Sequence, residues 1–225
     1  MAYRQDGGSA VNNGATPSFY NDFFDNHNYL TPNLGGSAAV NVGASNNATN
    51  PGQVSLEVSG AFGSSSLRYQ SVFTVGGGVS TLNNVVQIPV LGSASDRISL
   101  QIGYLDGFGG FQNGDPNNGI YFQYVDNVNS GQWQCITKAS GTPTTTNTSV
   151  AANTSFNNFS IVINAGGTSV GFYINGTLVA TNTTNIPSAL LAVIVSLGIG
   201  TSSGATMTAQ WDLVDFSQVL TTSRF

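Results

Sequence analysis

Charged side chains are scarce in this sequence of 225 residues. They make up 7% of the chain, and the formal net charge is −5 at pH 7. The basic residues are scattered along the chain at Arg4, Arg68, Arg97, Lys138 and Arg224. This distribution excludes nucleic-acid binding, because no row of cations could neutralise consecutive phosphates. The surface must instead be covered by uncharged polar side chains such as Ser, Thr, Asn and Gln.

The sequence also has few of the residues that cross-link or anchor a protein. Cys135 is the single cysteine, so no disulfide can form within the chain, and the Cys/His spacing of zinc sites is absent. No stretch approaches the roughly 18 apolar residues that span a bilayer, and residues 1–14 lack a signal-peptide pattern. We therefore expect no membrane association, and synthesis in a cytoplasm.

Catalytic groups are equally sparse. Glycoside hydrolysis needs two facing carboxylates, yet Glu57 is the single glutamate, and Asp212 and Asp215 would point to opposite faces of a strand. The single histidine, His27, lies in a loop-like DNHN segment without a nucleophile motif. The glycine-rich segment 107–119 lacks the lysine of a phosphate-binding loop. We predict that the chain is not an enzyme, with no catalytic residue and no cofactor.

Metal binding is the remaining chemistry to consider. Asp106 and Asp115, with the asparagines at 113, 117 and 118, could offer oxygens to a calcium ion, but their spacing matches no EF-hand loop. We predict no metal site.

Short runs of alternating apolar and polar residues dominate the sequence from residue 53 onward. Each run is bounded by Gly, Asn, Ser or Pro, which is typical of β-strands. We expect about ten strands. They lie at residues 54–60, 69–75, 83–91, 98–105, 120–125, 132–138, 159–164, 169–175, 177–182 and 209–220. Asn175-Gly176 predicts a type I′ hairpin turn. Residues 186–197 predict coil followed by a buried strand, and the Thr-rich residues 142–149 an exposed loop.

This pattern predicts an all-β protein in which one antiparallel, two-sheet sandwich covers residues 19–225. Residues 1–18 are polar and carry no periodic apolar residues. That composition is typical of a flexible, irregular arm that orders against a partner.

Two neighbouring strands carry the candidate binding residues. Tyr121 and Gln123 alternate with apolar residues of one strand, while Gln132 and Gln134 alternate with Trp133 and Cys135 of the next. Because alternate side chains of a strand point to opposite faces, Trp133 and Cys135 belong to the core and the four others to the outer face. These four could line a carbohydrate site, with Tyr121 as the aromatic platform. An ordinary solvated sheet face is the alternative.

Four segments of the chain are distinctive, namely GIYF at 119–122, DNVNSGQWQC at 126–135, FYINGTLVA at 172–180 and NPGQVSL at 50–56. The first three most specifically resemble the concanavalin A-like (laminin G-like) jelly-roll domains of tailed-phage virion proteins, and the fourth is similar to an early strand of the same group. The match spans roughly residues 19–216. The resemblance implies two packed antiparallel sheets, one of them concave, on the surface of a virion.

The role that this resemblance implies is non-enzymatic and structural. Such domains occur as capsid cement (decoration) proteins, so we expect a bacteriophage protein on the capsid surface that stabilises the head. Its partners would be the major capsid protein or other virion proteins and further copies of itself, most simply as a trimer. The alternative is a carbohydrate-binding tail or neck appendage for host adsorption, with glycans as the partner.

Overall fold

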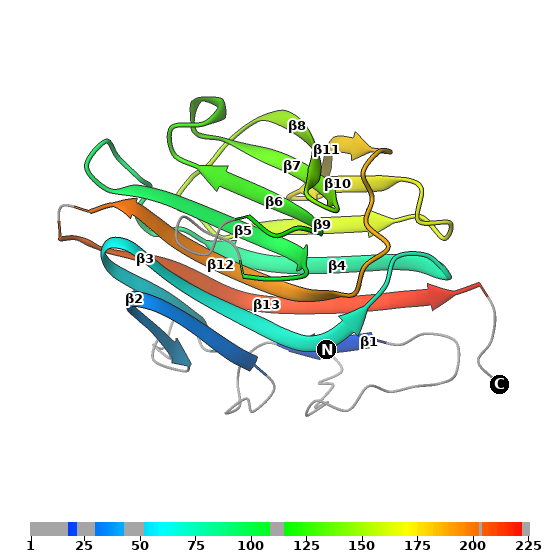
Figure 1. The fold of residues 1–225 in the computed structure, drawn as a ribbon, viewed down its shortest axis with the longest axis horizontal. Coiled ribbons are helices and arrows are strands. Elements are labelled where there is room, and N and C mark those ends of the chain that lie inside the picture. Colours follow the sequence, from blue (N-terminus) through cyan, green and yellow to red (C-terminus); the bar gives the residue numbers. More distant parts are fainter. Residues whose placement is uncertain (1–17, 22–29, 43–51, 109–114, 203, 222–225) are drawn as a thin grey trace.

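The computed structural model describes residues 18–21, 30–42, 52–108, 115–202 and 204–221. Apart from a short 3₁₀ turn at Asn129–Gly131, every regular element within these ranges is a β-strand. The strands are β1 Ser18–Asn21, β2 Leu30–Val42, β3 Val54–Phe73, β4 Gly78–Gln87, β5 Arg97–Leu105, β6 Gly119–Val125, β7 Gln132–Ala139, β8 Thr142–Ala151, β9 Asn157–Ile163, β10 Val170–Ile174, β11 Thr177–Asn182, β12 Leu191–Thr201 and β13 Thr206–Leu220 (Figure 1). No helix in these ranges is long and apolar enough to cross a membrane.

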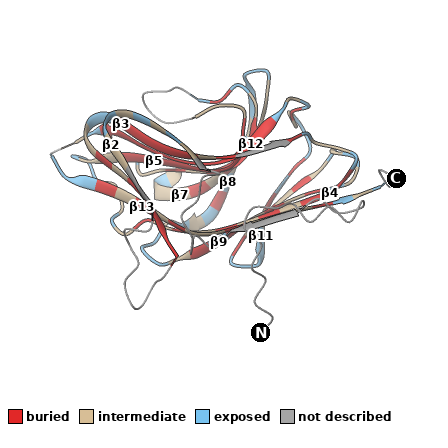
Figure 2. Cartoon of the chain, turned by 90° about the horizontal axis from the view of Figure 1, so that it is seen from below, coloured by how far each residue is buried: buried red, intermediate tan, exposed pale blue. Residues whose placement is uncertain are grey.

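The strands form two layers that share the long strand β3. Their order is β11-β10-β9-β4-β13-β3-β12-β5-β6-β7-β8, with β1 beside β13 and β2 beside β3. We call β11, β10, β9, β4 and β13 sheet I, and β12, β5, β6, β7 and β8 sheet II. Figure 2 shows the two sheets from below, with β5 and β12 in one layer and β4, β9 and β11 in the other.

A bend lets β3 belong to both sheets. Residues 54–59 of β3 pair with β13, and residues 64–73 pair with β12. Between them Gly60 has φ of 85°, a value that glycine adopts readily. A Cβ atom on Gly63 would lie 2.4 Å from Cγ1 of Val58, so any other residue there would displace that side chain. Strand β2 follows the same bend, since its pairing with β3 shifts between Gly35 and Ser37. The two sheets are thus joined through continuous backbone along this edge.

The core lies between the two sheets, where buried residues face one another (Figure 2). Trp133 packs on Phe159 with ring centroids 4.5 Å apart, and Phe122 meets Phe172 edge to face at 5.2 Å. Cys135 is also buried there, and burial raises the pKa of its thiol well above the usual range. The prediction that Trp133 and Cys135 belong to the core is confirmed.

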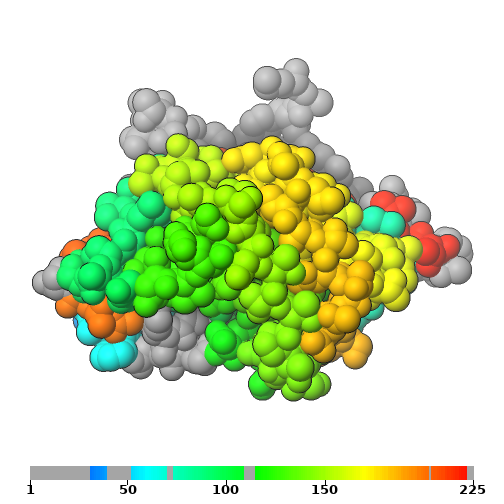
Figure 3. Space-filling view, turned by 90° about the horizontal axis from the view of Figure 1, so that it is seen from above, coloured from blue at the N-terminus to red at the C-terminus, as the bar shows by residue number. Residues whose placement is uncertain are grey.

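Side chains close the opposite edge of the sandwich, where β8 and β11 meet. Asn182 of β11 is buried and donates from Nδ2 to Oγ1 of Thr137 at 3.3 Å, while its Oδ1 accepts from Thr146 Oγ1 at 2.7 Å. Thr137 in turn donates to the carbonyl oxygen of Thr184 at 2.8 Å. Figure 3 shows the yellow-green residues of β8 beside the amber residues of β11. We call this hydrogen-bonded contact the β8–β11 seam.

The structure confirms most predicted strands and corrects two expectations. The Asn175-Gly176 turn connects β10 and β11, and residues 191–201 form a buried strand. The Thr-rich residues 142–149 are not a loop, because they pair with β7 as strand β8. The predicted strands 54–60 and 69–75 are parts of the single strand β3. Of the expected arm at 1–18, only Ser18 is among the described residues, where it begins β1.

Candidate functional site

A row of polar side chains crosses the outer face of sheet II and extends onto β3 and β2. Each member lies directly opposite the next one on the neighbouring strand. The members, from β2 to β8, are Asn33, Ser66, Ser196, Gln101, Gln123, Gln134 and Asn147. Since neighbouring strands lie about 4.8 Å apart, the row places a polar side chain at each such step. We call it the polar row.

The polar row is buried in its middle, on β3, β12 and β5, and accessible at its β8 end. Ser66, Ser196 and Gln101 are buried, and the hydroxyl oxygens of the two serines lie 2.5 Å apart. Gln123 and Gln134 are half-buried and Asn147 is exposed. Gln134 Nε2 donates to Oδ1 of Asn147 at 2.7 Å, which holds both amides in place. The accessible end therefore offers amide groups from three adjacent strands.

Two buried polar atoms of β5 have no hydrogen-bond partner. They are Oγ of Ser99 and Oε1 of Gln101, two residues apart on the same face of the strand. A buried polar group without a partner costs about 1–3 kcal/mol, so such atoms are usually matched by water or a ligand. The outer face of sheet II therefore retains unused hydrogen-bonding capacity.

Next to the polar row, the outer face of sheet II becomes apolar. Tyr121 is 1% exposed and clusters with Leu105, Ile136 and Ile194, against which Phe108 packs. Burial, together with the negative charges of nearby carboxylates, raises the pKa of the Tyr121 phenol well above its usual value. Tyr121 is therefore neutral at physiological pH, and its ring is not an exposed platform.

Asp106 and Asp115 are the carboxylates whose charges act on Tyr121. Asp115 accepts from Nε2 of Gln101 at 3.3 Å and lies 3.9 Å from the Lys138 ammonium. Asp106 accepts from Nδ2 of Asn118 at 2.8 Å. Asp106 and Asp115, the two carboxylates considered above as calcium ligands, therefore both have partners within the protein. Among the described residues, no three His, Cys, Asp or Glu side chains are grouped so that they could hold a metal ion.

The structure brings together two of the four predicted site residues. Gln123 and Gln134 lie opposite each other in the polar row, whereas Gln132 pairs with Ala151 beyond its end and Tyr121 is buried. Their role in binding stays a prediction. Gln101 was not among the predicted site residues, although its alternation with Leu100 and Ile102 could have placed it on the same face. His27 lies outside the described residues.

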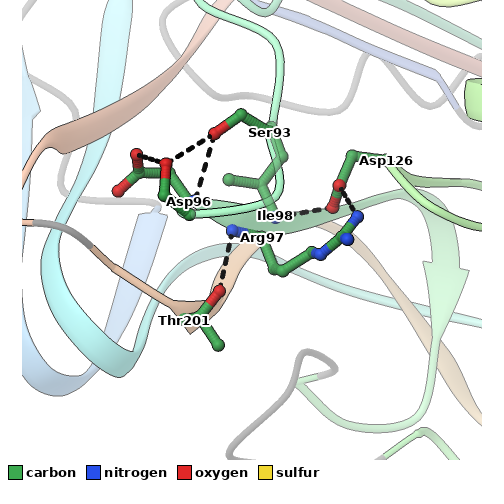
Figure 4. Close-up of polar contacts among 7 residues, drawn as sticks. Ser93, Asp96, Arg97, Ile98, Asp126 and Thr201 are labelled. Atoms are coloured by element: carbon green, nitrogen blue, oxygen red, sulfur yellow. Dashed lines mark hydrogen bonds and ion pairs between the residues drawn. The ribbon is translucent and has the colours of Figure 1, made fainter.

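The DNVNSGQWQC segment has structural roles. Asp126 is nearly buried, forms an ion pair with Arg97 and accepts from the backbone N–H of Ile98 at 3.1 Å (Figure 4). Asn129, in the left-handed region with φ of 50°, donates to the carbonyl oxygens of Trp133 and Thr148. These contacts fix the turns at one end of sheet II, which accounts for the residue types without a ligand.

No family model matches the chain, and no curated protein is similar to it in sequence. Solved structures share its fold. The Emp47p carbohydrate recognition domain has a TM-score of 0.61 at 12% identity, covering 92% of this chain and 96% of that chain. The winged bean acidic lectin, complexed with methyl-α-D-galactose, has a TM-score of 0.61 at 15% identity, covering 92% and 100%. The Bacillus licheniformis β-glucanase has a TM-score of 0.53 at 15% identity, covering 88% and 97%. The chain thus has a concanavalin A-like jelly-roll fold.

These likenesses correct one prediction from the sequence. The prediction that the chain is not an enzyme is contradicted, because a β-glucanase is among the structures with this fold. The sequence lacks a facing carboxylate pair and a nucleophile motif. A fold that hosts catalysis can place other groups on the same sheet face, so the absence of those motifs does not exclude an activity.

Proposed function

We propose that this protein binds glycans at the accessible end of the polar row. The observation that carries this proposal is the alignment of Gln123, Gln134 and Asn147 on three adjacent strands. Amide groups offer both donors and acceptors, which suits the paired donor and acceptor character of sugar hydroxyls. Their spacing of about 4.8 Å is comparable with the length of one pyranose unit. The lectins that share the fold support the same class of ligand.

The charges near the polar row favour a neutral glycan. Lys138 and Asp115 lie beside each other at 3.9 Å, so their charges offset one another locally. The whole sequence has five basic residues, and Arg68, Arg97 and Lys138 are those within the described ranges, too few to neutralise a polyanionic sugar. Binding should therefore depend little on salt concentration.

The test compares the native chain with Gln123→Ala/Gln134→Ala on a panel of neutral oligosaccharides, by glycan array and calorimetry. Two lost hydrogen bonds, at about 1 kcal/mol each, should weaken binding about thirtyfold. Val90→Ala is the matched control, since Val90 is 58% exposed and lies after β4. Absence of any glycan binding, or equal affinity of the double variant, would eliminate the polar row as the site. The length of each oligosaccharide after incubation reports any cleavage.

The biological setting of this binding rests on the resemblance alone. A phage virion, the capsid surface and a trimer stay predictions, and host adsorption by a virion appendage is the setting that glycan binding fits.

A further inference from the structure

A second polar row crosses the opposite outer face, on sheet I. Asp215 of β13 lies opposite Asn83 of β4, Asn83 opposite Ser160 of β9, and Ser160 opposite Tyr173 of β10. The residues on either side of Tyr173, Phe172 and Ile174, are buried in the core. Strand alternation therefore puts Tyr173 and its row on the outer side.

Hydrogen bonds order this second row, and those made between described residues leave some of its donors and acceptors unused. Ser160 Oγ donates to Oδ1 of Asn83 at 2.7 Å, and Asn83 Nδ2 donates to Oδ2 of Asp215 at 3.3 Å. An amide nitrogen has two N–H groups and a carboxylate has two oxygens, so each has further bonds to make. The row thus presents fixed donors and acceptors on a half-buried surface.

The ring of Tyr173, at the β10 end of this row, lies along its own strand and covers Gly171. A Cβ atom on Gly171 would be 3.0 Å from Cε2 and 3.4 Å from the hydroxyl oxygen of Tyr173, so the ring fills the space of a side chain at 171. Leu178 lies opposite Tyr173 on β11 and is 52% exposed. An aromatic ring and an exposed leucine therefore form an apolar patch beside amide and hydroxyl groups.

We propose that this face, formed by Tyr173, Ser160, Asn83 and Asp215, is a second binding surface for a neutral glycan. An aromatic ring in contact with the C–H groups of a sugar, flanked by amides and hydroxyls for its O–H groups, is the combination that a pyranose requires. Strands β4, β9, β10, β11 and β13 contain no Lys or Arg. A polyanion therefore has no cation to pair with on this sheet.

The two surfaces lie on opposite sides of the sandwich, so one chain can hold two glycan chains. Linked sites raise the overall avidity for a surface dense in glycans. The second surface extends the proposed function, but its residues are separate from those of the polar row on sheet II. The two proposals can therefore fail independently.

The experiment measures affinity and stoichiometry for cellohexaose, maltohexaose and mannohexaose by calorimetry. The variants are Tyr173→Ala and Tyr173→Leu, each alone and in the Gln123→Ala/Gln134→Ala background, with Val90→Ala as control. We expect two hexasaccharides per native chain. Loss of the ring should weaken the second site at least about tenfold, and Tyr173→Leu should weaken it too, because leucine keeps apolar bulk without a flat ring.

A stoichiometry of one that Tyr173→Leu leaves unchanged would overturn this inference while leaving the polar row intact. The second surface would also be contradicted if the Gln123→Ala/Gln134→Ala variant bound none of the hexasaccharides that the native chain binds. Loss of all binding in Tyr173→Leu, with an unchanged melting temperature, would instead place the glycan site on sheet I alone and contradict the site on sheet II.

Discussion

At the scale of single residues, Asn84 is a buried amide on the core-facing side of β4. It is 1% exposed and lies between Leu82 and Val86, with Val214 and Phe159 opposite it on the neighbouring strands. Neither its amide nitrogen nor its carbonyl oxygen has a hydrogen-bond partner. Burial of an amide without compensation costs about 1–3 kcal/mol in proteins.

We therefore expect Asn84→Val to stabilise the protein. Valine suits a strand and removes the unpaired groups, so the free energy of unfolding should rise by about 1–2 kcal/mol. Chemical denaturation measures it. The matched control is Asn83→Val, because Asn83 points outward and its amide atoms are already bonded to Ser160 and Asp215. A stability loss in Asn84→Val would mean that water or a ligand satisfies this amide.

At the scale of elements, the β10–β11 hairpin depends on two residues with positive φ. Asn175 has φ of 50° and Gly176 of 79°, as a type I′ turn requires. Oδ1 of Asn175 also accepts from the backbone N–H of Asn158 at 2.9 Å. The turn is thus tied to the beginning of β9.

The double variant Asn175→Val/Gly176→Val should be severely destabilised. Each β-branched residue in the left-handed region costs about 1–2 kcal/mol. The variant also loses two hydrogen bonds of the Asn175 side chain, from the backbone N–H of Asn158 and to Oδ1 of Asn157, which add about 2 kcal/mol. A drop of about 4–6 kcal/mol in the free energy of unfolding is expected. Thr177→Val, next in sequence but inside β11, is the control and should change little. An unchanged melting temperature of the double variant would contradict the turn assignment.

Strands with one apolar face were predictable from the sequence, and strands without one were not. Strand β8 was missed because the covered positions of its inner face are threonines, with Thr144 and Thr146 half-buried and Thr148 buried, so that apolar and polar residues do not alternate. The β-branched threonines were the available indication. In β3 the buried Ser64, Ser65 and Ser66 interrupt the apolar pattern, so one bent strand appeared as two.

For the candidate sites, the sequence predicts which face of a strand a residue occupies but not which residues lie beside it on other strands. Alternation placed Gln123 and Gln134 on one outward face, but pairing between strands decides that they face each other and Asn147. The burial of Tyr121 depends on residues far away in the sequence, such as Ile194. Tyr173 could have been found, since it alternates with Phe172 and Ile174 and follows a glycine at the preceding outward position.

At the scale of the whole molecule, Asn182 holds the β8–β11 seam. Its side chain is bonded to groups of β7 and β8, including the carbonyl oxygens of Cys135 and Thr144, both at 3.4 Å. We expect Asn182→Leu to lower the free energy of unfolding by about 2–3 kcal/mol, because it leaves buried polar groups unpaired. Thermal denaturation beside Thr181→Leu, an exposed neighbour, checks this expectation. Equal melting temperatures would mean that the seam adds nothing to stability.

The bend of β3 determines at which edge the two sheets can separate by local unfolding. On that edge, separating the sheets requires breaking the backbone hydrogen bonds of β3 with β12 or β13. On the other edge, the hydrogen bonds that the described residues make between β11 and strands β7 and β8 all involve a side chain. Regions with few buried backbone bonds open locally at a lower free energy than core strands. Amide protons of β8 and β11 should therefore exchange with solvent long before those of β12, which makes the β3 edge a hinge and the β8–β11 edge the opening side.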